Sequence, residues 1–70
     1  MQYYQTISTR CAKVALFKYG PFLSTIDLIM YTREWVKAYQ VPQTVRRDTI
    51  MLTFIKYFKR YPNEKEEKLI

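Results

Sequence analysis

Apolar and polar residues alternate with the period of an α-helix in the last third of the chain. Winding Val45 to Tyr61 at about 100° per residue gathers the large apolar residues on one side, which carries Ile50, Met51, Phe54, Ile55, Tyr57, Phe58 and Tyr61. The opposite side carries Arg46, Thr49, Thr53, Lys56, Lys59 and Arg60. The pattern predicts a helix that buries its apolar side and presents cations and hydroxyls to a negatively charged partner.

A second amphipathic helix is predicted from Thr25 to Tyr39. Its apolar side consists of Leu28, Ile29, Tyr31, Trp35, Val36 and Tyr39. Its polar side consists of Asp27, Arg33, Glu34 and Lys37. Ser24 and Asp27 have the spacing of a capping box, which indicates that the helix begins after Ser24. We expect its apolar side to pack against that of the helix in the last third.

The first segment, Tyr3 to Lys18, has a less regular pattern. Its apolar residues fall near one face, which carries Tyr3, Ile7, Cys11, Val14 and Phe17. Arg10 and Lys18 lie at the margins of this face, where their aliphatic stems can cover a core while the charge reaches water. A helix is predicted, and a strand from Lys13 to Tyr19 is the alternative.

Glycine and proline separate these segments. Gly20-Pro21 ends the first, Pro42 divides the second from the third, and Pro62 stops the third. Because such short connections favour antiparallel neighbours, the sequence predicts an all-α fold, a compact three-helix arrangement in a single domain of residues 1–70. The charged segment from Asn63 to Ile70 is a short C-terminal helix or a tail.

Composition limits how this fold is stabilised. Seventy residues are close to the smallest size at which a hydrophobic core alone suffices. Cys11 is the single cysteine, and there is no histidine, so neither a disulfide framework nor a metal site is expected. The core must depend on Trp35, seven tyrosines and four phenylalanines. We expect a protein partner or self-association to contribute to stability.

The net charge of +6 indicates affinity for phosphate groups, anionic headgroups or acidic protein surfaces. Alternatively, the protein is simply basic. Three cations and no carboxylate precede Asp27. This composition resembles a mitochondrial presequence, but an ordinary basic helix is the favoured interpretation. A basic helix lying on an anionic membrane is a further alternative. No secretory signal or membrane-spanning run of about 20 apolar residues is visible, so an intracellular location, cytoplasmic or organellar matrix, is expected.

The residues needed for catalysis are scarce. Without histidine the commonest general base is missing. Cys11 is interpreted as a buried apolar residue, although nearby cations could activate its thiol. Asp27 and Glu34 lie two helical turns apart, roughly 10 Å along the axis, and are better explained as a solvated stripe. No enzyme activity, catalytic residue, cofactor or metal is therefore expected.

Two families resemble parts of the chain. The run from Val41 to Asp48, Val-Pro-Gln-Thr-Val-Arg-Arg-Asp, resembles the start of the recognition helix in DeoR-type helix-turn-helix repressors, which show Val-Ser-x-x-Thr-Val-Arg-Arg-Asp. Here one residue of the turn is missing, proline replaces the capping serine, and no wing follows. The resemblance implies that Gln43, Thr44, Arg46 and Arg47 lie near the major groove of DNA.

The longer run from Tyr39 to Glu64 is similar to the C-terminal motif of the Rap1a/Tai immunity proteins of type VI secretion. In that motif Cys-x-Pro-x-x-Val leads into a helix ending in Lys-Tyr-Leu, with a proline soon after. The residues that fit are Pro42, Val45, Lys56, Tyr57, Phe58 and Pro62. Gln40 stands in place of the cysteine. The resemblance implies a helical protein that neutralises a toxin by binding it.

The sequence thus predicts a small, non-enzymatic, basic helical binding module. Its partner is a nucleic acid or ribonucleoprotein, or an acidic surface in a larger assembly. The predicted contacts are Arg46, Thr49, Thr53, Lys56, Lys59 and Arg60. The alternatives are an immunity protein and a structural accessory subunit of a larger complex, which the presequence-like composition would place in mitochondria.

Overall fold

The computed structural model describes the backbone of residues 3–70 and the side chains of residues 5–70. Four α-helices follow in order: α1 (Tyr3–Tyr19), α2 (Thr25–Ala38), α3 (Arg46–Phe58) and α4 (Glu64–Leu69). Single 3-10 turns precede α2 and α3, namely η1 (Gly20–Phe22) and η2 (Gln43–Val45). The predicted all-α fold is confirmed. The alternative of a strand in residues 13–19 is wrong, because these residues continue α1.

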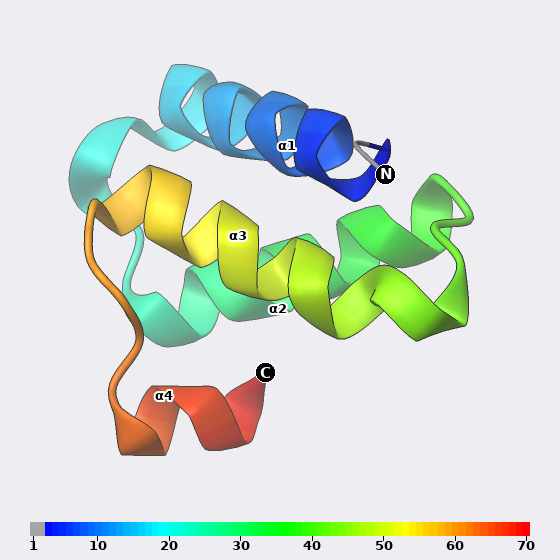
Figure 1. The fold of residues 1–70 in the computed structure, drawn as a ribbon. Coiled ribbons are helices and arrows are strands. Elements are labelled where there is room, and N and C mark those ends of the chain that lie inside the picture. Colours follow the sequence, from blue (N-terminus) through cyan, green and yellow to red (C-terminus); the bar gives the residue numbers. More distant parts are fainter. Residues whose placement is uncertain (1–2) are drawn as a thin grey trace.

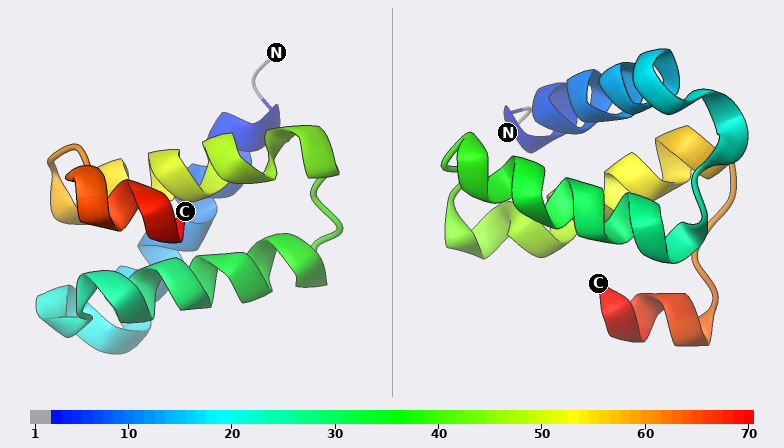
Figure 2. Two further views of the ribbon diagram at one scale, coloured as in Figure 1. Left: turned by 90° about the horizontal axis from the view of Figure 1, so that it is seen from below. Right: turned by 180° about the vertical axis from the view of Figure 1, so that it is seen from behind.

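Helix α3 packs against both α1 and α2 (Figure 1). Helix α4 contacts α2 and lies on the opposite side of the α2–α3 pair from α1 (Figure 2). The C-terminal segment is therefore a short helix and not a frayed tail. Within residues 3–70, no helix combines the length and apolarity needed to cross a bilayer.

Local capping explains where the helices begin and end. The Ser24 hydroxyl accepts a hydrogen bond from the Asp27 N–H at 3.1 Å and so starts α2. Asn63 and Glu66 form a reciprocal capping box at the start of α4. Lys59 adopts a left-handed conformation, with φ of 61°. It therefore ends α3 at Phe58, three residues before the predicted end.

The predicted packing of α2 on α3 forms the main core. Its buried apolar side chains are Ala15, Leu28, Ile29, Val36, Val41, Ile50, Phe54 and Tyr57. The Tyr57 hydroxyl donates a hydrogen bond to the Gly20 carbonyl and accepts one from the Leu23 N–H at 3.2 Å. One buried ring thereby fixes the turn between α1 and α2 to the core.

The face of α1 that enters the core agrees only in part with the predicted one. The buried side chains are small: Ser8, Cys11, Ala12 and Ala15. Phe17 is 91% exposed, and Val14 is only half-buried; the side chain of Tyr3 lies outside the described residues. The prediction was right for Cys11 and for Ile7, which packs against the core, and wrong for Phe17. Phe17 is excluded because the distance between two helix axes depends on the side chains at the contact. Small side chains let α1 approach α3 closely.

Candidate functional site

Two of the predicted contacts, Thr49 and Thr53, are not at the surface. Both are fully buried. The Thr49 hydroxyl donates to the Val45 carbonyl at 2.7 Å, and the Thr53 hydroxyl donates to the Thr49 carbonyl at 2.8 Å. The Thr49 carbonyl also accepts a hydrogen bond from Ser8 of α1 at 3.1 Å. The prediction that these hydroxyls face a partner is wrong, because bonds to the preceding turn satisfy them inside the protein.

Lys56 and Lys59 are separated by the way α3 packs and ends. The Lys56 ammonium donates to Thr9 Oγ1 at 2.5 Å and to the Gln5 carbonyl at 3.4 Å, so this side chain crosses to α1. Lys59 is exposed just beyond the end of α3. The predicted cationic side of this helix is therefore not one continuous surface.

Arg60 is already compensated by an acidic group of the same chain. Its Nη1 and Nη2 atoms donate to the two carboxylate oxygens of Glu66, at 2.9 and 3.0 Å. The guanidinium carbon lies 5.2 Å from the ring centre of Phe54 and 5.8 Å from that of Phe58. Arg60 thus covers the core and holds α4, and it no longer belongs among the predicted partner contacts.

The contact between Arg60 and Glu66 makes stability depend on pH. The hydrogen bond from Arg60, followed by that from the Asn63 N–H, lowers the pKa of Glu66 from 4.5 to about 2. A lowered pKa stabilises the folded state above the unfolded value, and this contribution is lost as pH falls from about 4.5 to about 2. We expect Glu66→Gln to weaken the fold at neutral pH and to flatten its acid dependence in this range.

Urea unfolding of the wild-type protein and of Glu66→Gln at several pH values checks this expectation. Glu67→Gln is the matched control, because Glu67 is exposed on the same helix. An acid dependence that is as steep in Glu66→Gln as in the wild-type protein would contradict the expectation.

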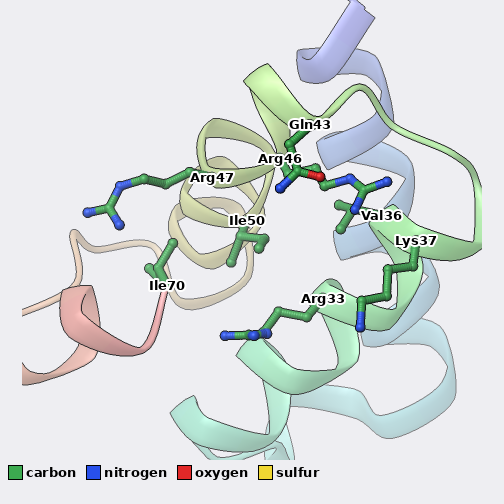
Figure 3. Close-up of a pocket in the computed structure, with 8 residues that line it drawn as sticks. All are labelled: Arg33, Val36, Lys37, Gln43, Arg46, Arg47, Ile50 and Ile70. Atoms are coloured by element: carbon green, nitrogen blue, oxygen red, sulfur yellow. The ribbon is translucent and has the colours of Figure 1, made fainter.

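The structure brings another set of cations together in a pocket between α2 and α3. This pocket has a volume of about 270 Å³ and is lined by Arg33, Val36, Lys37, Gln43, Arg46, Arg47, Ile50 and Ile70. Figure 3 shows Arg33 and Lys37 on the α2 side and Arg46 and Arg47 at the start of α3. We call these residues the α2–α3 groove. Of the predicted contacts, it contains Arg46 alone.

Four positively charged side chains line the α2–α3 groove, and no acidic side chain is among its lining residues. The single ion pair within residues 3–70 is that of Arg60 with Glu66, so the groove cations are not paired with carboxylates of the described chain. Arg46 Nε donates to the Val41 carbonyl at 2.8 Å, and Arg33 Nη1 donates to the Leu69 carbonyl at 3.2 Å. These bonds orient two guanidinium groups without neutralising them.

The position of Arg46 and Arg47 increases the positive potential. They occupy the first turn of α3, where the helix dipole favours anions and disfavours cations. Asp48 is the single acidic residue of that turn. A local rule of helix stability is thus violated at the groove, which is typical of functional sites. A bound anion would relieve this repulsion.

Some sequence signals of the groove exist. Arg33 and Lys37 are four residues apart, so they share a face of the predicted second helix. The short connection after Tyr39 brings the end of this helix beside the start of α3. The sequence pattern assigned Arg46 to the polar side of the third helix, and Arg33 and Lys37 to that of the second, without predicting that these residues meet.

The thiol of Cys11 does not form a reactive site. Its side chain is fully buried, and this burial raises its pKa from 9.0 to about 11. The thiolate, which is the nucleophilic form, is therefore disfavoured at neutral pH. The interpretation of Cys11 as a small buried apolar residue is confirmed.

Part of the aromatic side of α2 stays at the surface. The rings of Trp35 and Tyr39 lie 4.5 Å apart, and Tyr31 contacts both Trp35 and Tyr19. Trp35 and Tyr31 are half-buried, and Tyr39 is exposed. The need for a partner or for self-association to stabilise the protein stays a prediction.

Comparisons with known protein families, curated proteins and solved structures yield no match for this chain. The resemblances to DeoR-type repressors and to the Rap1a/Tai immunity proteins therefore stay predictions. The α2–α3 groove contains Gln43, Arg46 and Arg47, three of the four residues that the first resemblance places near DNA.

Proposed function

We propose that this chain is a non-enzymatic binding module that docks on the phosphate groups of a nucleic acid through the α2–α3 groove. One observation carries the proposal: four cationic side chains from two helices line one pocket without any acidic side chain among its lining residues. Anions are attracted to such a concentration of unpaired positive charge.

The chemistry of the groove favours phosphate over isolated carboxylates. Three of its four cations are arginines. A guanidinium group presents a planar fork of donors that binds two phosphate oxygens at once. The phosphates of a nucleic acid form a closely spaced row, so several of these cations can be engaged together. An acidic protein surface is the second partner class that this charge fits.

A salt titration of nucleic-acid binding tests the proposal. Binding is compared between the wild-type protein and the double variant Lys37→Gln with Arg47→Gln. These two side chains show no hydrogen bond within the described part of the chain, and we expect their loss to leave the fold intact. On duplex DNA each lost phosphate contact should reduce the slope of log K against log salt by about 0.9. The double variant should therefore reduce the slope by about 1.8.

The double variant Lys59→Gln with Lys65→Gln is the matched control. It also removes two positive charges, but from exposed positions that do not line the groove. Its loss of affinity for nucleic acid should be smaller than that of the groove variant, and it should keep the wild-type slope. Absence of nucleic-acid binding even at low salt, or equal changes in both variants, would overturn the proposal. Salt-dependent binding to polyglutamate alone would assign the groove to an acidic protein surface.

A further inference from the structure

We propose that the outer face of α1 and the turn η1 dock on an anionic phospholipid surface. We call this surface the α1 outer face and define it by Arg10, Lys13, Phe17 and Phe22. It shares no residue with the α2–α3 groove. The inference therefore goes beyond the proposed function and does not depend on it.

Phe17 and Phe22 are the most exposed large apolar side chains in residues 5–70, at 91% and 86%. The direction of Phe17 follows from the small side chains that α1 turns inward. Ala15 is fully buried, and two further residues rotate the helix by about 200°. Phe17 therefore points away from the core. Two such exposed rings, one in the last turn of α1 and one in the turn that follows it, indicate an interaction surface.

The turn itself holds Phe22 outward. Gly20 has a φ of 62°, a conformation that favours glycine. The Phe22 ring lies against Gly20 so closely that a Cβ atom there would be 3.1 Å from the ring. The ring thus packs on the turn and is still exposed. Because its conformation is already restricted, little side-chain entropy would be lost when it enters a lipid interface.

Cations accompany these rings. Arg10, Lys13 and Phe17 follow the spacing i, i+3, i+7 and share one side of α1, and Arg10 and Lys13 are both exposed. Both cations line a shallow hollow of about 370 Å³, whose other lining residues are Thr6, Thr9 and Val14. The Lys56 ammonium, bonded to Thr9, adds positive charge at its edge. Lipid phosphates fit such a hollow beside rings that enter the interface.

The charge of this region selects the partner. The first 26 residues contain three cations and no carboxylate. In a symmetric pair of copies, the same cations would face one another and repel. An anionic bilayer instead attracts the cations and accepts exposed aromatic rings without a matching shape. A bilayer surface is thus favoured over a second copy of the chain.

Sedimentation with vesicles tests this inference. One set contains phosphatidylcholine alone, and the other an equimolar mixture of phosphatidylcholine and phosphatidylglycerol. The wild-type protein should bind the mixed vesicles at least tenfold more tightly, because each cation near an anionic surface contributes roughly a fivefold factor. The variant Arg10→Gln with Lys13→Gln should bind the mixed vesicles about 25-fold more weakly.

The variant Phe17→Ser with Phe22→Ser should lose binding to the mixed vesicles, with an unchanged circular dichroism spectrum and melt. Ile26→Ser with Met30→Ser is the matched control, since these apolar side chains of α2 are 57% and 52% exposed. It should bind like the wild-type protein. Equal binding to both kinds of vesicle, equal losses in the two serine variants, or loss of self-association in place of vesicle binding would overturn the inference.

The salt titration with DNA distinguishes failure of the lipid-binding inference from failure of the proposed nucleic-acid binding. The variant Phe17→Ser with Phe22→Ser should keep the wild-type slope for DNA, and the groove variant Lys37→Gln with Arg47→Gln should keep most of its vesicle binding. A groove variant that loses vesicle binding as completely as the phenylalanine variant would place the lipid contact in the groove and overturn the inference.

Discussion

Replacing Phe54 with alanine should lower the free energy of unfolding by about 3–5 kcal/mol. Its side chain is fully buried in the core between α2 and α3. Its ring centre lies 4.7 Å from that of Phe58, and the Arg60 guanidinium covers it. The substitution leaves a cavity in place of the buried ring and removes the ring on which the Arg60 guanidinium packs. For so small a domain this is a large part of the total stability. Urea unfolding followed by circular dichroism measures the loss.

Phe17→Ala is the matched control, because it removes the same atoms from an exposed position. Phe17 is in contact with water on the outer side of α1, so its truncation should change the free energy of unfolding by no more than about 0.5 kcal/mol. Similar losses in the two variants would show that Phe17 also belongs to a core. Such a result would contradict the orientation of α1 that places Phe17 at the surface.

The contrast between these two phenylalanines shows which features the sequence could predict. Helix α2 and the break before α3 followed from local signals, since the Ser24 cap and Pro42 act on their immediate neighbours. The end of α3 did not, because Lys59 ends this helix before Pro62 is reached. The packing of α2 on α3 also followed, because both helices carry a stripe of large apolar residues. Local propensity and strong periodicity were sufficient for these elements.

The contact between α1 and α3 could not be predicted in the same way. A helical pattern weighs large apolar side chains, and it counts threonine as polar and alanine as nearly neutral. In the structure Thr49 and Thr53 satisfy their hydroxyls on the preceding turn, and Ser8 and Ala12 let the helices approach. Hydrogen bonding within α3 thus makes a polar-looking face suitable for burial. This effect turned Phe17 away from the core and removed Thr49 and Thr53 from the predicted contacts on α3.

The α2–α3 groove depends on tertiary structure for a different reason. Arg33 and Lys37 are separated from Arg46 and Arg47 by the turn that reverses the chain, and their proximity depends on the angle between two helices. Periodicity assigns a face to each helix but does not give that angle. The charged residues were therefore visible in the sequence, and their convergence on one pocket was not.

Replacing Ala15 with leucine should lower the free energy of unfolding by about 1–3 kcal/mol, through overpacking. Ala15 is fully buried in the core cluster. The added atoms must force α1 away from α3 or displace neighbouring side chains. Leucine and alanine have similar helix propensities, so the loss reports packing between helices and not the stability of α1 itself. Urea unfolding measures it.

Ala38→Leu is the control for the same change of side chain, since Ala38 is exposed at the end of α2. Its effect should stay within about 0.5 kcal/mol of zero. If the small residues of α1 determine the interhelical distance, the two substitutions should not be additive. The double variant Ala15→Leu with Phe54→Ala should lose less free energy of unfolding than the two single variants lose together, because the larger side chain can occupy part of the cavity. Strict additivity together with a neutral Ala15→Leu would mean that α1 does not pack tightly on α3. The buried threonines would then be accessible, and the original cationic side of α3 would again be a candidate surface.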